Sequence, residues 1–235
     1  MQAARLTKPL PGTTIDPRYP DSDGRFMGDT DYHTISMIQI REDLQDFFAS
    51  ADVYVASDLM MYYEEGNPIA RKEPDILVAK GVGKHKRRSY RFWEEKKKPR
   101  VLFEVASKRT WRVDIGEKRW LYATLGIKEY FLYDPEAKYL DPPLQGFRLV
   151  NGKSVPIKPN ADGSLTSKEL GLRMIIEGDI LRFINNKSGE RLLTRAERAE
   201  KMEMLEREKE EWSEEKNKLL AEIKTLRRRA EDPGP

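Results

Sequence analysis

Between residues 99 and 135 the spacing of apolar positions changes from that of a strand to that of a helix and back. The run 101–106 is rich in strand-forming residues and is apolar at every position except Glu104. Because successive residues of a strand point to opposite faces, Glu104 shares one face with Leu102 and Ala106, and the other face is wholly apolar. This pattern predicts a strand buried on both faces, and its one carboxylate needs a partner because an unpaired buried charge is costly.

The helix that we expect after this strand carries a candidate partner on its inner face. Apolar residues at three- and four-residue intervals predict that face, namely Ile115, Tyr122 and Leu125. Lys118 occupies the position between the first two of them, near the N-terminal end. Asp114 and Glu117 have the spacing of a capping box, and Gly126 stands where a glycine commonly ends a helix. Two interpretations of Lys118 are open: a structural ion pair with Glu104, or a catalytic amine beside that carboxylate.

Other parts of the chain show the same two spacings. Apolar residues at helical spacing predict a helix from about residue 33 to residue 48, and Asp29, Thr30 and Asp31 stand where its capping residues belong. Short apolar runs bounded by turn residues predict further strands at 52–63, 75–79, 146–150, 155–158, 172–176 and 181–184. These elements predict an α/β (α+β) domain in which helices flank a mixed sheet and added hairpins extend or cover it.

These patterns divide the chain into four parts. Residues 1–24 contain several prolines and little apolar pattern, which predicts an arm that is disordered or follows the protein surface. Residues 25–190 hold the domain, residues 191–230 form a charged helix, and residues 231–235 are expected to be a disordered tail.

The charged segment 191–230 has a sparse apolar repeat. Its apolar residues take the two core positions of a heptad, and they are Met202, Leu205, Trp212, Leu219, Ile223, Leu226 and Ala230. Lys209 and Lys216 fill the two remaining core positions and weaken the repeat. We expect a marginal coiled coil that helps the chain to form a homo-oligomer, namely a dimer. The alternative is an isolated helix that is stabilised by its charges.

Composition narrows the chemistry that the chain can carry. Its 235 residues include no cysteine and only two histidines, which excludes disulfides and thiolate metal sites and makes oxygen the expected ligand of any metal. The net charge of +3 is too small to indicate a nucleic-acid or membrane partner by itself. No N-terminal segment resembles a signal peptide and no window is apolar enough to span a membrane, so we expect a soluble, cytoplasmic protein without a membrane partner.

Residues 80–98 are strongly basic and interleave their cations with Tyr90, Phe92 and Trp93. Cations in such a segment can follow the phosphates of a nucleic acid while the aromatic rings anchor the loop or stack on bases. The alternative is a plain solvated loop. The candidate phosphate contacts are Lys84, Lys86, Arg87, Arg88 and Arg91.

A set of short motifs then points to a family. The motifs are Pro74-Asp75, Glu104-Val105, Asp-x-Gly-Glu-Lys at residues 114–118 with Tyr122, Gly126 and Glu129-Tyr130 after it, and Asp134-Pro135. Together they resemble the Uma-type restriction-endonuclease-like family, a bacterial branch of the PD-(D/E)xK nuclease superfamily. The resemblance runs from about residue 19 to residue 191, and it implies a restriction-endonuclease-like core of helix, three strands, helix and strand. It would place Asp75 on the second core strand and Glu104 on the third.

The resemblance also implies an activity. Asp75 and Glu104 would hold Mg²⁺ (or Mn²⁺) with the backbone carbonyl of Val105, and the reaction would be endonucleolytic hydrolysis of DNA phosphodiesters. The superfamily's lysine usually follows the glutamate by two residues, where this chain has Ala106. In the Uma-type family a lysine on the next helix, here Lys118, looks like its replacement.

Further residues and a second function stay open. Lys108 ranks second to Lys118 as the catalytic lysine. Asp31, His33 and Glu42 are candidates for an outer part of the site, and a capping or solvated role is the alternative for His33 and Glu42. The alternative function is a catalytically degenerate nuclease fold that binds nucleic acid or serves as an oligomerisation module.

Overall fold

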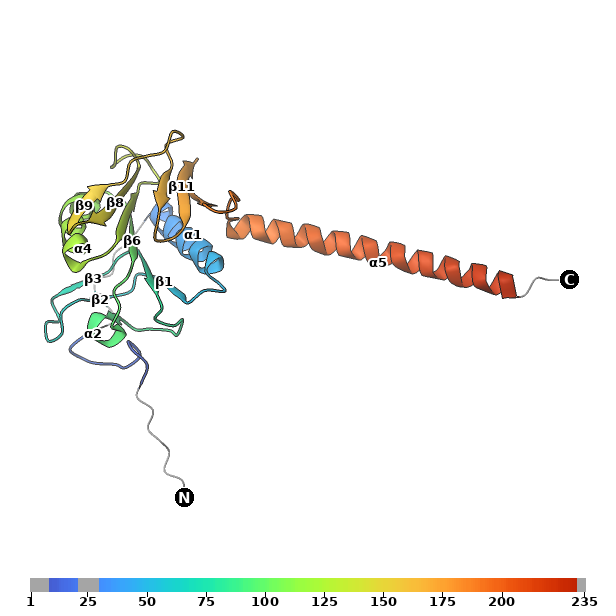
Figure 1. The fold of residues 1–235 in the computed structure, drawn as a ribbon, viewed down its shortest axis with the longest axis horizontal. Coiled ribbons are helices and arrows are strands. Elements are labelled where there is room, and N and C mark those ends of the chain that lie inside the picture. The colour runs from blue at the N-terminus through green and yellow to red at the C-terminus, as the bar shows by residue number, and fades with distance from the viewer. Residues whose placement is uncertain (1–8, 21–29, 232–235) are drawn as a thin grey trace, which may run out of the picture. The chain divides into compact units, whose positions relative to one another are not determined.

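The computed structural model describes residues 9–20 and 30–231 of the chain. Contacts within the chain divide it into two units, residues 1–192 and residues 193–235. The first unit holds the sheets and the shorter helices, and the second holds one long helix (Figure 1).

A six-stranded mixed sheet forms the centre of the first unit. Its strands lie in the order β1 (Val53–Ser57), β4 (Ile76–Lys80), β6 (Val101–Val105), β7 (Glu129–Tyr133), β8 (Leu144–Val150) and β9 (Lys153–Pro156). In this sheet β6 and β7 pair in parallel, and the other neighbours pair antiparallel. A parallel pair needs a long crossover, and the helical segment between residues 111 and 125 provides it.

The first face of the central sheet is covered by a helix and a second sheet. The helix, α1 (Asp31–Phe47), has Thr30 as its N-cap, because the Thr30 hydroxyl accepts a hydrogen bond from the N–H of His33; Asp29 lies outside the described residues. The second sheet consists of three antiparallel strands, β10 (Leu165–Ser167), β11 (Leu172–Glu177) and β12 (Ile180–Asn185). Apolar residues of both layers and of the central sheet form one core, which includes Ile40, Leu44, Phe103, Phe131 and Phe183.

The second face is covered by a helical segment of three consecutive pieces, α3 (Trp111–Val113), the π-helical turn η1 (Asp114–Lys118) and α4 (Arg119–Leu125). Tyr122 of this segment packs in a core with Leu102 and Leu132 of the sheet. Figure 1 shows α1 and α4 on opposite sides of β6, in agreement with a strand buried on both faces. The expected α+β fold, a mixed sheet flanked by helices with added hairpins, is therefore confirmed.

The helix after β6 begins earlier than its capping pattern suggests. Asp114, expected at the N-cap, lies inside the helical segment with helical backbone angles (φ −65°, ψ −47°) and is buried. The capping-box prediction is therefore wrong, because this carboxylate contacts Lys118 in the interior instead of the N–H groups at a helix end. The prediction for the other end is confirmed: Gly126 adopts the left-handed conformation (φ 85°) and caps the helix.

Part of the basic segment 80–98 is regular structure that the sequence pattern did not predict. It contains β5 (Tyr90–Arg91) and, directly after it, α2 (Phe92–Glu95). β5 pairs with β2 (Met61–Tyr62), which pairs on its other side with β3 (Arg71–Lys72), so these strands form a small third sheet.

Residues 9–20 of the N-terminal arm pack on this small sheet. The Tyr19 side chain is 5% exposed, and its ring centroid lies 5.1 Å from those of Tyr62 and Trp93. The described part of the arm therefore follows the protein surface, which is one of the two arrangements expected for it. Residues 1–8 and 21–24 of the arm lie outside the described residues.

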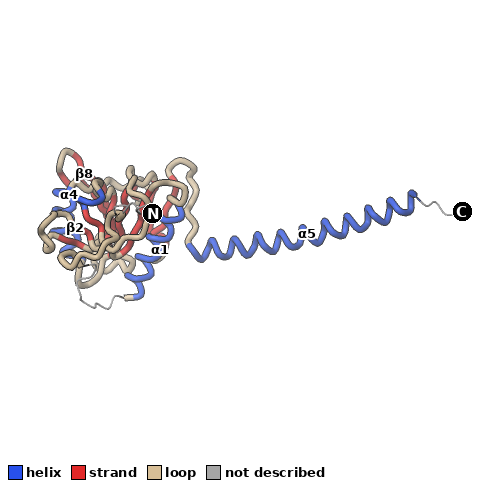
Figure 2. The backbone as a smooth tube through the Cα atoms, turned by 90° about the horizontal axis from the view of Figure 1, so that it is seen from below, coloured by secondary structure: helices blue, strands red, loops and turns tan. Residues whose placement is uncertain are grey.

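The second unit contains α5 (Arg195–Glu231), a helix of 37 residues that Figure 2 shows as one uninterrupted stretch. It begins with a capping box that sequence analysis did not identify: the N–H of Thr194 donates to the Glu197 carboxylate (2.7 Å), and the N–H of Glu197 donates to the Thr194 hydroxyl (3.3 Å). A long charged helix in this part of the chain is thus confirmed. None of the helices in the part of the chain that the structure describes is both long and apolar enough to span a bilayer.

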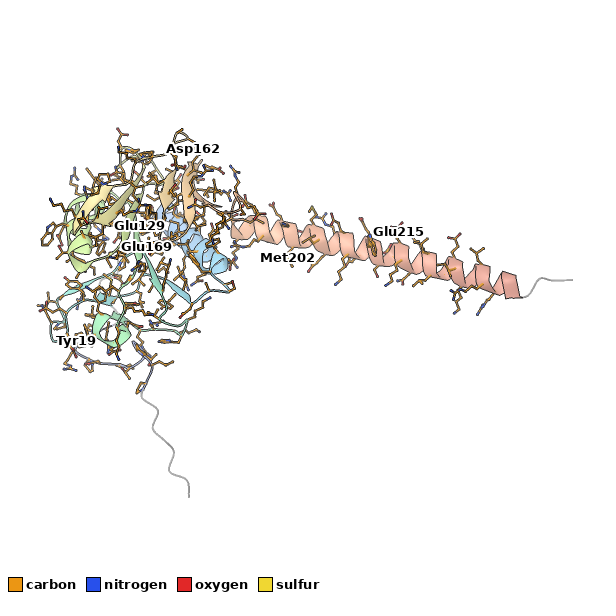
Figure 3. The ribbon with its side chains drawn as sticks, viewed as in Figure 1. Tyr19, Glu129, Asp162, Glu169, Met202 and Glu215 are labelled. Carbon is orange, nitrogen blue, oxygen red and sulfur yellow. The ribbon has the colours of Figure 1, made fainter. Side chains whose placement is uncertain are left out.

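One buried carboxylate connects the central sheet with the second sheet. Glu129, the first residue of β7, is 1% exposed and accepts a hydrogen bond from the Arg148 side chain (2.8 Å). It also accepts hydrogen bonds from the Ser167 hydroxyl and from the N–H groups of Lys168 (3.0 Å) and Glu169 (3.2 Å). Figure 3 shows Glu129 and Glu169 side by side in the first unit.

We expect Glu129→Ala to lower the free energy of unfolding by about 3–5 kcal/mol, because Arg148 loses its charged partner and the buried hydroxyl of Ser167 and two part-buried N–H groups lose their acceptor. Urea unfolding of both proteins measures this difference. Glu64→Ala is a matched control, since Glu64 is exposed and accepts one side-chain hydrogen bond from Asn67, and its effect should stay within about 0.5 kcal/mol. Equal effects of the two changes would contradict the connecting role of Glu129.

Candidate functional site

The pairing of β4 with β6 brings two carboxylates together. Ile76 lies opposite Phe103 in this antiparallel pair, so the register extended by one residue sets Asp75 opposite Glu104. Residues directly opposite in neighbouring strands share a face of the sheet. Asp75 is also held in place, because its Oδ2 accepts a hydrogen bond from the N–H of Val105 (2.6 Å) and lies 3.2 Å from Nε2 of His33.

Glu104 is 1% exposed, and two side chains from the covering helix contact its carboxylate. Oε1 accepts a hydrogen bond from the hydroxyl of Tyr122 (2.9 Å), and Oε2 lies 2.8 Å from Nζ of Lys118. The same Nζ lies 2.8 Å from Oδ1 of Asp114. The amine therefore stands between two buried acids, with its side chain only 13% exposed.

Helical geometry explains how one element supplies these contacts. Asp114, Lys118 and Tyr122 recur at four-residue intervals, so they fall on neighbouring turns of one face, and that face packs on β6 and β7. The hydroxyl of Tyr130 on β7 donates to the backbone oxygen of Asp114 (3.0 Å) and fixes this turn against the sheet. The π-helical hydrogen bonding of residues 114–118 falls at the same turn, a deviation that is frequent at functional sites.

The cluster holds more negative than positive charge. Burial raises the pKa of Glu104 to about 8; the ammonium of Lys118 opposes this shift, and the charges of Asp75 and Asp114 add to it. Burial likewise raises the pKa of Asp114. Burial alone would lower the pKa of Lys118, but the carboxylates around it outweigh burial and raise it. Three acids around one amine therefore favour the uptake of a further positive charge.

A divalent cation fits this donor set. Mg²⁺ prefers carboxylate and carbonyl oxygens and keeps several waters, so two carboxylates on adjacent strands are a sufficient protein contribution. Among the described residues no three histidine or acidic side chains gather as a metal centre, so the remaining ligands would be solvent and substrate oxygens. Val105, expected to contribute its carbonyl, belongs to the cluster because its N–H donates to Asp75.

The other candidates for the site separate into one that joins the cluster and three that lie elsewhere. His33 is buried and contacts Asp75. Asp31 is exposed in the first turn of α1, and Glu42 follows His33 by nine residues, half a turn around the helix axis. Lys108 is exposed in the turn that follows β6.

Most cations of the basic segment have structural partners. Arg87 has a side chain with 0% exposure, binds Glu95 (Nε to Oε1, 2.6 Å) and stacks on the ring of Tyr54 at 4.1 Å. Arg91 is 3% exposed and contacts Glu94 (2.9 Å).

Lys84 donates to the backbone oxygens of Phe48 (2.6 Å) and Ala49 (2.8 Å), where carbonyls at the end of α1 attract positive charge. Lys86 and Arg88 are exposed. Lys84 is exposed as well, so three of the five candidates have the exposure that contact with phosphates requires.

Asp114 and Tyr122 belong to the cluster but are not among the residues predicted for the site. The signal for Asp114 was present, since an acid four residues before a lysine forms a pair on one helix face. That spacing was assigned to a cap instead. Tyr122 was expected on the inner face as a packing residue, and its hydroxyl contact with Glu104 depends on the approach of the helix to β6.

Comparisons with known proteins place the chain in a family. A family model described as "Putative restriction endonuclease" (Uma2) matches residues 14–180. A crystal structure described as a putative nuclease belonging to DUF820, from Anabaena variabilis, aligns with a TM-score of 0.45 and 11% sequence identity, covering 63% of this chain and 80% of that chain. No curated protein matches the sequence. Because the family model spans well over half of its residues, the chain belongs to the Uma2 family of restriction-endonuclease-type proteins.

Proposed function

We propose that this protein is a Mg²⁺-dependent endonuclease that hydrolyses phosphodiester bonds of DNA. The observation that carries the proposal is the meeting of Asp75, Glu104 and Lys118 in one cluster, although the first and the last stand 43 positions apart in the chain. Membership of a nuclease family supports the reaction class. The choice of DNA, of the metal and of the residue roles is our proposal.

Each residue of the cluster has a proposed task. Asp75 and Glu104, with the carbonyl of Val105, would hold Mg²⁺ or Mn²⁺. When bound, the cation supplies Lewis-acid neutralisation of charge at the scissile phosphate. Lys118 is held by Glu104 and Asp114, so its ammonium would orient the attacking water or neutralise negative charge that develops on the phosphoryl oxygens. Tyr122 and His33 position the two carboxylates through their hydrogen bonds.

Cleavage of a supercoiled plasmid tests this function. We expect nicked and linear products with Mg²⁺ or Mn²⁺, none with EDTA, and a loss of at least about 100-fold in rate for Glu104→Gln, which keeps the size of the side chain and removes its charge. Undiminished cleavage by Glu104→Gln would refute the assignment. Binding of DNA without cleavage by the wild-type protein under either metal would instead favour the degenerate module.

A second group of exposed cations lies in the segment that joins two elements of the cluster. Lys108, Arg109 and Arg112 are exposed between β6, which carries Glu104, and the helical turn that begins at Asp114. Side chains at this position can reach the phosphates that flank a scissile bond. We therefore propose that they share the backbone contacts with the exposed cations of the basic segment.

We expect Lys108→Gln/Arg109→Gln to weaken DNA binding by about 10-fold at low salt and to reduce the salt slope of log K by about 1–2, because each lost phosphate contact removes about 0.9 from that slope. Fluorescence anisotropy over a range of salt concentrations measures both quantities. The matched variant Lys86→Gln/Arg88→Gln removes two exposed cations from the basic segment. If only this second variant changes the slope, the phosphate contacts lie on the basic segment and the first assignment is wrong.

A further inference from the structure

A row of exposed apolar side chains runs along α5. Six apolar residues of this row are each between 45% and 73% exposed, and we call them the seam: Met202, Leu205, Trp212, Leu219, Ile223 and Leu226. They lie three, four or seven residues apart, at the first and fourth positions of a heptad. Exposed apolar side chains at these heptad positions are typical of the contact face of a coiled coil. Figure 3 labels Met202 at one end of the helix and Glu215 near its middle.

We propose that α5 pairs with α5 of a second copy of the chain as a parallel, in-register coiled coil. Lys209 and Lys216 fill the two heptad core positions between the apolar residues of the seam, and their charges bear on the partner and the orientation. Lys209 follows Glu208 directly, and Lys216 follows Glu215 directly. In a parallel, in-register pair, a residue at the first heptad position lies beside the partner's residue one position earlier. Lys209 then meets Glu208 of the partner subunit, and Lys216 meets Glu215 of the partner subunit.

The residues that flank the seam favour the same arrangement. In parallel pairs the residue before a first position faces the partner residue five positions later. Lys201 then faces Glu206 of the partner subunit, and Glu222 faces Arg227 of the partner subunit, so both flanking pairs attract. Between these two flanking pairs lie two more of the same kind. They join Glu208 to Ser213 of the partner subunit and Glu215 to Leu220 of the partner subunit, and neither brings like charges together.

The antiparallel alternative creates repulsion. The alignment that sets Met202 against Leu226 of the partner subunit would also set Glu215 against Glu215 of the partner subunit. Further along the same edge it would pair Glu208 with Glu222 of the partner subunit, again two like charges. Like-charge pairs across an interface suppress the wrong partner and orientation.

In the parallel pair Lys209 and Lys216 also lie opposite their own copies, but each then lies beside a glutamate of the partner subunit, and the two flanking pairs attract. The balance of charged pairs therefore favours the parallel pair of identical helices.

Parallel pairing has a consequence for the reaction, which rests on the function proposed above. α5 begins at Arg195, three residues after the first unit ends at Leu192. In a parallel pair both first units join the coiled coil at the same end, whereas antiparallel pairing would separate them by the length of a 37-residue helix, about 55 Å. Two metal sites joined at one end could act on the two strands of one DNA duplex.

Disulfide trapping tests the orientation directly, because the natural chain has no cysteine. We expect Met202→Cys alone and Leu226→Cys alone each to form cross-linked homodimers on oxidation of the full-length protein. A mixture of the two variants, one carrying a size tag, should give no 202–226 cross-link. Cross-links that form only in the mixture would establish antiparallel pairing and overturn the proposal, as would the absence of any cross-link.

Sedimentation equilibrium compares the dimer dissociation constants of two variants, one changed within the seam and one changed outside it. Leu219→Lys places a charge in the seam and should raise the dimer dissociation constant at least about 100-fold. Met204→Lys changes an exposed residue outside the seam (49% exposed) and should leave the constant within about 2-fold. Equal effects of the two changes, or a monomeric wild-type protein, would refute the seam. If the dimer forms but cuts no DNA, the pairing stands and the proposed function fails.

Discussion

Replacing Asp75 by asparagine is expected to lower Mg²⁺-dependent DNA cleavage by at least about 1,000-fold, because the change removes one of the two charges that hold the cation. Asparagine has the shape of aspartate, and its side-chain oxygen can still accept the hydrogen bond from the N–H of Val105. The fold should therefore persist, and the loss should come from the chemistry of the site.

Two measurements separate these effects. Plasmid cleavage with Mg²⁺ and Mn²⁺ gives the rates, and urea unfolding shows whether Asp75→Asn remains folded. Asp162→Asn is the matched control, since Asp162 (Figure 3) is exposed and its carboxylate accepts hydrogen bonds from Ser164 in the turn before β10. Comparable rates for Asp75→Asn and the wild-type protein would eliminate Asp75 as a metal ligand.

Lys118→Met is expected to reduce cleavage by about 100- to 1,000-fold, the usual effect of removing a group that stabilises charge in the transition state. The same change should lower the free energy of unfolding by about 3–5 kcal/mol, because Glu104 and Asp114 remain buried without the amine between them. A structural ion pair predicts the loss of stability alone, whereas a catalytic amine predicts both losses.

The activity of Lys118→Met has to be measured at temperatures at which the variant is fully folded. Urea unfolding defines that temperature range, and cleavage is then compared within it. Lys72→Met is a suitable control: Lys72 pairs with Glu117 at 2.7 Å, but that glutamate is 63% exposed, so the change should alter stability by less than about 1 kcal/mol. Full activity of folded Lys118→Met would show that Lys118 has a structural role and no catalytic one.

The sequence determined those features that depend on local spacing. Alternation along residues 101–106 separated Glu104 from the wholly apolar face of β6. Helical spacing set Lys118 on the inner face of the helical segment 111–125, and the two residues meet there. Gly126 ended that helix as expected, because a glycine readily adopts the left-handed conformation. In each case the period of the backbone is a local property, so a few neighbouring residues are enough to predict it.

Tertiary structure decided what each polar group meets. The register of β4 against β6 put Asp75 opposite Glu104, and no local pattern contains that register. Asp114 looked like a cap in sequence but is buried against Lys118, because the helix begins three residues earlier. Arg87 looked like a phosphate contact but is paired with Glu95 in the interior. Hydrogen bonds and ion pairs act over a few ångströms in space, and the folded chain alone sets which residues lie within that distance.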